Sequence, residues 1–89
     1  MLLNLSAKTV QAKCFYELEE YDLLDTHLEA LRKYIHRHKE VGYYGERYLN
    51  FVAVLRRLAR ATPGIRDSMR QEIADMQVLA EKAWLLERL

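Results

Sequence analysis

Two amphipathic segments joined by a short acidic turn, within residues 12–35, constrain the fold of this chain more than any other stretch. The second segment repeats leucine or isoleucine at intervals of four, three and four residues, which is the period of a helix face. The turn, Glu19–Asp22, offers Asp22 as an N-cap for the helix that follows. The pattern therefore predicts an αα-hairpin with helices over residues 3–20 and 22–39. A single hairpin cannot bury its whole apolar surface, so further helices must cover the rest.

The second half of the chain repeats this plan. Helical periodicity runs over residues 44–61 and again over residues 63–88. Gly42 is placed to end the second helix in a left-handed conformation, and Thr62 followed by Pro63 is placed to start the last helix. Because short connections force antiparallel neighbours, we expect an all-α chain of four antiparallel helices. The helices form two stacked αα-hairpins, 3–39 and 44–88, within a single domain, 1–89.

Each expected helix has one expected buried face, read from its apolar spacing. The first face is Leu3, Ala7, Val10, Cys14 and Leu18. The second is Leu24, Leu28, Leu31 and Ile35. The third is Tyr48, Phe51, Val52, Leu55, Leu58 and Ala59. The fourth is Ile65, Met69, Ile73, Met76, Leu79, Ala80, Ala83 and Leu86. A core shared by both hairpins is expected to contain Leu28, Leu31, Phe51, Leu55 and Met76.

Composition supports a globular protein of a reducing compartment. Apolar residues make up 51% of the chain, and three glycines and one proline are too few for the frequent turns of a small β-sandwich. One cysteine excludes an internal disulfide, and neither a signal peptide nor a membrane-spanning run is visible, so we expect a cytoplasmic location. Leu2, Leu3 and Leu5 stand at the terminus without a polar cap, as in a fragment of a longer chain or a natural start whose leucines pack on the core.

Residues 12–31 resemble a tetratricopeptide repeat, a two-helix unit. With Tyr21-Asp22 set on the family's turn, Ala12 matches its small position, Phe15 its aromatic position, and Leu24, Leu28 and Leu31 its next packing positions. The chain departs from the family pattern with Lys8 for Trp, Glu19 for the turn Gly, Leu24 and Leu31 for small Ala, and His36 for the closing Pro. The whole chain is also similar to the C-terminal end of long, uncharacterised bacterial helical-repeat proteins. The resemblance implies a noncatalytic scaffold for protein–protein interaction, the terminal part of a longer array.

The sequence contains no motif that predicts catalysis, a metal or a cofactor. His36 and His38 are two residues apart on a helix and point in different directions, so they cannot share a metal ion. Cys14 lies in the expected apolar face with no histidine three or four residues away, which indicates an inert buried thiol. Glycine-rich phosphate loops and nucleophile–base pairs are also missing, so we expect no enzyme activity and no cofactor.

Charge is unevenly distributed, which bears on partners rather than on the fold. Residues 1–31 hold two lysines against six acidic residues, net −4, whereas residues 32–60 hold eight Lys/Arg against two acidic residues, net +6. Arginines and tyrosines interleave in residues 32–60, the pattern of binders of RNA or single-stranded DNA. That is the alternative function. Two observations favour a solvated or protein-contacting face instead. The pI is near 7.9. The acidic residues 17–29 could also face this basic region, within the fold or from another subunit.

The partner-binding surface is expected around the Gly42 turn. Tyrosine and arginine are enriched at interaction hot spots, and five candidates flank that turn: Arg37, His38, Tyr43, Tyr44 and Arg47. A second expected surface is an apolar side of the first helix, formed by Leu2, Leu3, Leu5, Val10 and Phe15. It would meet a preceding repeat of a longer chain, or a second copy in a homodimer.

Overall fold

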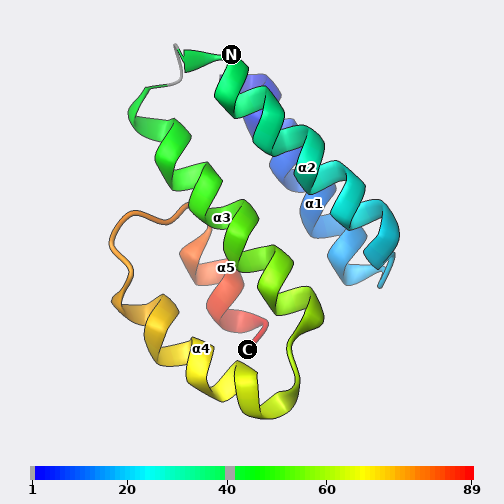
Figure 1. Cartoon of the computed structure of the whole chain (residues 1–89), viewed down its shortest axis with the longest axis vertical. Coiled ribbons are helices and arrows are strands. Elements are labelled where there is room, and N and C mark those ends of the chain that lie inside the picture. The colour runs from blue at the N-terminus through cyan, green and yellow to red at the C-terminus, as the bar shows by residue number, and fades with distance from the viewer. Residues whose placement is uncertain (1, 40–41) are drawn as a thin grey trace. The chain divides into compact units, whose positions relative to one another are not determined.

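The chain folds into helices joined by short connections in the computed structural model, which describes residues 2–39 and 42–89 (Figure 1). The helices are α1 (Leu2–Glu17), α2 (Tyr21–Arg37), α3 (Tyr43–Arg60), α4 (Pro63–Asp75) and α5 (Lys82–Glu87). No strand occurs within these two described ranges, so the all-α prediction is confirmed. The prediction of four helices is wrong, since the described chain has five. Two compact units divide the chain, Met1–Gly45 and Glu46–Leu89, and each is considered by itself below.

The turn between α1 and α2 is closed by backbone hydrogen bonds. The N–H of Glu20 donates to the carbonyl of Phe15 at 2.9 Å, and the N–H of Glu19 donates to the carbonyl of Tyr16 at 3.1 Å. This pair of bonds is the Schellman motif, and it requires a left-handed residue, which is Glu19 with φ of 58°. Glu20 is the N-cap of α2 and makes no side-chain capping bond, so the assignment of Asp22 as N-cap is wrong.

α2 buries the face that its spacing predicts. Its buried residues are Leu24, Leu28, Leu31 and Ile35, the predicted set. α2 packs on α1, and the two helices lie side by side in Figure 1. Each of these four buried aliphatic side chains stabilises the fold by about 1.5–3 kcal/mol relative to an exposed one.

α1 buries the side opposite to the one that was predicted. Its buried residues are Leu5, Thr9, Ala12 and Tyr16, whereas Ala7, Val10, Cys14 and Leu18 are exposed. The predicted burial of Cys14 is therefore wrong. The buried set also repeats at four, three and four residues, so periodicity alone does not choose between the two sides. The buried hydroxyl of Thr9 donates to the carbonyl of Leu5 at 2.8 Å, which removes the cost of burying it. The side chains of Leu2 and Leu3 lie outside what the structure describes.

Polar and aromatic contacts fix this orientation of α1 against α2. The imidazole of His27 on α2 donates from Nε2 to the carbonyl of Lys8 on α1 at 2.7 Å. The same ring meets Phe15 edge to face, with the ring centroids 5.6 Å apart. Lys8 also places its ammonium 5.0 Å from the centre of the Tyr34 ring. These contacts tie the flank of α1 to α2 and leave Val10 and Cys14 on the outside.

Gly42 precedes α3 and has a φ of +53°, the left-handed conformation predicted for it, although α2 has already ended at Arg37. α3 is broadly buried, as its apolar face predicts. Phe51, Val52, Leu55 and Leu58 are buried, Tyr48 and Ala59 are half-buried, and Val54 is buried in addition.

α4 begins as predicted and ends earlier than predicted. Thr62 is the N-cap, its hydroxyl accepts from the N–H of Ile65 at 3.4 Å, and Pro63 occupies the first helical position. The predicted helix over residues 63–88 is wrong, because α4 ends at Asp75 and α5 begins only at Lys82. The reason is tertiary, since no glycine or proline stands at residues 76–81.

Hydrogen bonds to α3 hold the non-helical segment between α4 and α5. The side chain of Asn50 donates to the carbonyl of Val78 at 2.7 Å, and the N–H of Ala80 donates to the carbonyl of Arg47 at 3.1 Å. Lys82 donates to the carbonyl of Met76 at 2.8 Å. The break also changes the predicted buried face: Met69, Ile73, Leu79 and Ala80 are buried, as is Leu85, while Ile65 and Ala83 are exposed and Met76 and Leu86 are half-buried. Met76 is therefore not the fully buried core residue that was predicted.

Candidate functional site

An apolar row on α1 is the first candidate surface. It consists of Ala7, Val10 and Cys14 on the helix and Leu18 directly after its end, and is called here the outer face of α1. At about 100° per residue, this row lies on the opposite side of the helix from Leu5, Thr9, Ala12 and Tyr16. Val10 is 56% exposed and Leu18 is 70% exposed. A helix with apolar residues on both sides is typical of one that is covered from both sides.

The end of α2 carries two of the five predicted partner-binding residues. Arg37 is exposed and lines a shallow hollow of about 510 Å³ together with Arg32, Lys33 and His36. His38 is the C-cap of α2, half-buried, with its ring centroid 4.3 Å from that of Tyr34. Aromatic stacking holds His38 against its own helix, so Arg37 is the better placed of the two to reach a partner.

The other three predicted residues begin α3. Tyr44 is 46% exposed, and Arg47 is half-buried with its carbonyl bonded to Ala80. The side chain of Tyr43 lies outside the described part of the structure. Arg47 belongs to the second compact unit and the other four residues to the first, so their assembly into one surface stays a prediction.

Arginine–carboxylate pairs partly neutralise the basic region 32–60. Arg32 donates to both carboxylate oxygens of Glu29, at 2.6 and 3.1 Å, and this hydrogen bonding raises the pKa of Arg32. Arg57 donates to both oxygens of Glu72, at 2.9 and 3.0 Å. These bonds lower the pKa of the Glu72 carboxyl and raise the pKa of Arg57. Both pairs are well exposed to solvent, so they orient side chains more than they stabilise the fold.

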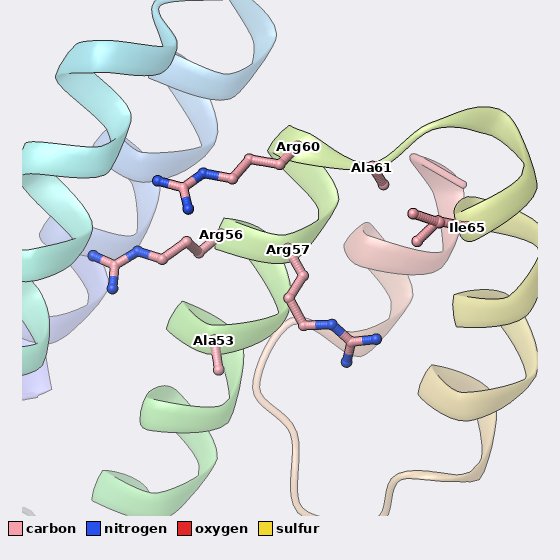
Figure 2. A pocket seen from close by; sticks show the side chains of 6 residues that line it. All are labelled: Ala53, Arg56, Arg57, Arg60, Ala61 and Ile65. Carbon is pink, nitrogen blue, oxygen red and sulfur yellow. The ribbon is translucent and has the colours of Figure 1, made fainter.

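A second hollow lies on α3 and the start of α4, with a volume of about 500 Å³. Figure 2 shows its lining residues, which are Ala53, Arg56, Arg57, Arg60, Ala61 and Ile65. Arg56 and Arg60 extend side by side, while Arg57 extends the other way, toward α4 and Glu72 (Figure 2). Ile65 is 51% exposed at its edge. Apolar side chains beside arginines suit a partner that is partly apolar and partly anionic.

Comparison of the chain with protein-family models, with curated proteins and with solved structures gave no match. Among the described residues, no three His, Cys, Asp or Glu side chains gather as a metal site would require. No helix in that part of the chain is both long and apolar enough to cross a bilayer.

Sequence reasoning missed the outer face of α1 as a surface, because it assigned the same residues to the core. It did anticipate a second apolar side of α1, but placed Leu5 and Phe15 on it. Leu5 is buried and Phe15 is half-buried against His27, so that composition is wrong. Val10 was assigned both to this side and to the buried face, and it is exposed. The sequence signal that could have identified this face is the presence of apolar residues on two opposite sides of α1. A search for one repeating apolar row finds only one of the two sides.

Proposed function

We propose that this chain is a noncatalytic protein–protein interaction scaffold, whose partner packs on the outer face of α1. The observation that carries the proposal is the exposed apolar row Ala7, Val10, Cys14 and Leu18 opposite the buried side of the same helix. Exposed apolar rows on a folded helix mark interaction surfaces, because burying them against a partner removes apolar surface from water and so favours binding.

The occupant of this face, in the proposal, is a helix of another repeat or protein, as in tetratricopeptide-like arrays. In such arrays each helical hairpin is covered by its neighbour, so a helix of a terminal hairpin is apolar on two sides. The chain would then be the terminal part of a longer helical-repeat protein. The residues encoded before Met1 in the genomic reading frame test this directly: further helical hairpins support it, and an unrelated sequence or a stop codon contradicts it.

Affinity capture with matched variants tests the surface. Val10→Lys places a charge at the middle of the outer face of α1, whereas Ala74→Lys places one at an exposed position on α4. We expect Val10→Lys to lose a partner protein that both the unmodified chain and Ala74→Lys retain. Equal capture by all three proteins would contradict the proposal.

The predicted surface around the Gly42 turn has its own test. Tyr44→Ala combined with Arg47→Ala removes an exposed aromatic ring and a half-buried guanidinium from α3. If these residues contact the partner, capture is lost while the melting temperature stays within a few degrees. Unchanged capture, or a collapse of the fold, would reject this surface as the binding site.

A second candidate function is binding of RNA or single-stranded DNA by residues 32–60. The exposed cations Lys33, Arg37 and Arg60 favour it. Titration of a labelled oligonucleotide at two salt concentrations decides it. Phosphate contacts give an affinity that falls steeply with salt, and absence of binding at low salt rejects this function.

A further inference from the structure

The solvent side of α2 has acidic residues at one end and basic residues at the other. Asp22, Thr26, Ala30, Lys33 and Arg37 follow one another at intervals of four, four, three and four residues, and all five are exposed. They form one side of the helix, called here the outer face of α2, opposite the buried Leu24, Leu28, Leu31 and Ile35. Asp25, also exposed, adds a further carboxylate beside the acidic end.

The two ends of this face cannot neutralise each other within one chain. Asp22 and Arg37 are separated by about 22 Å along the helix at 1.5 Å per residue. That separation exceeds the screening length of about 10 Å at 0.1 M salt. Part of the pattern complements the helix dipole, since acidic residues suit the start and basic residues the end of α2. The dipole acts only on the first and last turns, so it does not account for Lys33, which lies before the last turn.

We propose that the outer face of α2 binds the same face of a second copy of this chain, with the two helices antiparallel about a two-fold axis. Such an interface must be self-complementary, so that each residue contacts the partner residue that contacts it in return. In the register centred between residues 29 and 30, Asp22 meets Arg37 of the second copy and Thr26 meets Lys33. The two-fold axis repeats both contacts, so Arg37 meets Asp22 and Lys33 meets Thr26 of the second copy.

The shape of the face supports the same register. A hollow of about 430 Å³ is lined by Asp25, Thr26, Glu29, Ala30 and Lys33, and the hollow beside Arg37 continues it toward the end of the helix. Thr26 and Ala30 are small, so a second helix can approach closely at the centre. The aliphatic stems of Lys33 and Arg37 can lie along the partner helix while their charged ends reach its carboxylates.

This inference concerns a different helix from the outer face of α1, so it does not rest on the proposed function. A second copy is favoured over an unrelated partner because Asp22 and Arg37, at the two ends of the face, meet each other twice in the antiparallel register. The net charge of +1 leaves little overall repulsion between copies.

Charge-reversal variants and their mixture test the inference. Lys33→Glu with Arg37→Glu makes the outer face of α2 acidic throughout, and Asp22→Lys with Asp25→Lys makes it basic throughout. By sedimentation velocity at high micromolar concentration and low salt, the unmodified chain should be a dimer and each variant alone a monomer. An equimolar mixture of the two variants should form a heterodimer, because each face then meets its opposite.

Two controls separate this interface from association through another part of the chain. Arg70→Glu reverses an exposed charge on α4 and should leave the dimer intact. Raising salt from about 50 to about 500 mM should weaken the dimer at least about tenfold, since exposed charge pairs are screened. A monomeric unmodified chain, a monomeric mixture or dimeric single variants would overturn the inference.

Cross-linking checks the register without reversing any charge. In a Cys14→Ser background, Ala30→Cys lies beside the two-fold axis and should form an intermolecular disulfide under mild oxidation. Thr26→Cys faces Lys33 of the second copy and should not. Cross-linking of both variants to the same extent would indicate a parallel arrangement, and cross-linking of neither would exclude this face as the contact.

Discussion

Shortening Leu28 to Ala should destabilise the protein by about 3 kcal/mol. Leu28 lies in the middle of α2 with none of its surface exposed. The substitution removes three buried carbon groups, worth about 0.8 kcal/mol each, so the transfer contribution alone is about 2.4 kcal/mol. The cavity left behind adds to this, and buried Leu→Ala substitutions cost about 2–5 kcal/mol in total. Such domains have a free energy of unfolding of about 5–15 kcal/mol, so the loss is a large fraction of it.

Leu23→Ala provides the matched control on the same helix. Leu23 is 52% exposed, so the same truncation loses about half of the transfer contribution and leaves no closed cavity. We expect it to cost about 1 kcal/mol, well below the cost of Leu28→Ala. Urea unfolding followed by circular dichroism at 222 nm measures both, with the midpoint shifting while the slope stays constant. A cost below about 1 kcal/mol for Leu28→Ala, or equal costs for the two variants, would mean that the assigned buried face of α2 is wrong.

Three further experiments probe two helix ends and one ion pair. Thr62→Ala should destabilise the protein by about 0.5–2 kcal/mol, because it removes the N-cap of α4. Thr62→Ser keeps the capping hydroxyl and should retain the stability. Equal stabilities of the two variants in thermal melts would refute the capping role. The Glu19→Gly variant should be more stable than the Glu20→Gly variant by about 1 kcal/mol. The reason is that Glu19 has a left-handed φ of 58°, which glycine adopts without cost, whereas Glu20 does not have a left-handed φ. The reverse order of stability would contradict the described turn. Arg57 lowers the pKa of Glu72, so their coupling is present above the unfolded pKa of that carboxyl and is lost as the pH falls through its folded pKa. A double-mutant cycle of Arg57→Gln and Glu72→Gln should give less than about 1 kcal/mol at neutral pH and nothing in acid, and a coupling that persists in acid would exclude the ionic contribution.

The sequence predicts the part of the fold in which one helix face is apolar and the other is polar. α2 satisfies this condition, and its buried residues agree with the prediction. α1 does not satisfy it, because Leu5 and Tyr16 compete with Val10 and Leu18 for the interior. The choice between those two sides depends on contacts with side chains of α2, in particular the hydrogen bond from His27 to the carbonyl of Lys8. That is a tertiary contact between residues nineteen positions apart.

The interruption between α4 and α5 is also a tertiary effect. Residues 76–81 contain no helix-breaking glycine or proline, so local propensity favours one long helix. The helix ends where Asn50 and the Arg47 carbonyl on α3 offer hydrogen bonds to the following backbone. The left-handed Glu81 then redirects the chain into α5. A short segment bonded to a neighbouring helix leaves no periodic signal in its own sequence.

The candidate surfaces also differ in how far the sequence predicts them. Arg37 was predicted as a partner contact from its residue type and position; the structure shows that it is exposed on α2, and its contact with a partner stays a prediction. The outer face of α1 could not be identified, because an apolar row reads as core until the structure shows which side is covered. Exposure is a property of the packed hairpin and not of the spacing.

The rate at which a thiol reagent labels Cys14 tests the outer face of α1 most directly. Cys14 is the single cysteine of the chain and lies exposed at the centre of that face. An exposed thiol reacts without any opening of the structure, so the native rate should be within about tenfold of the rate in concentrated urea. A core thiol reacts only through unfolding and would be slowed by about a thousandfold or more at ordinary domain stability. Labelling that follows the unfolding rate would contradict the orientation of α1 and the interaction surface proposed on it.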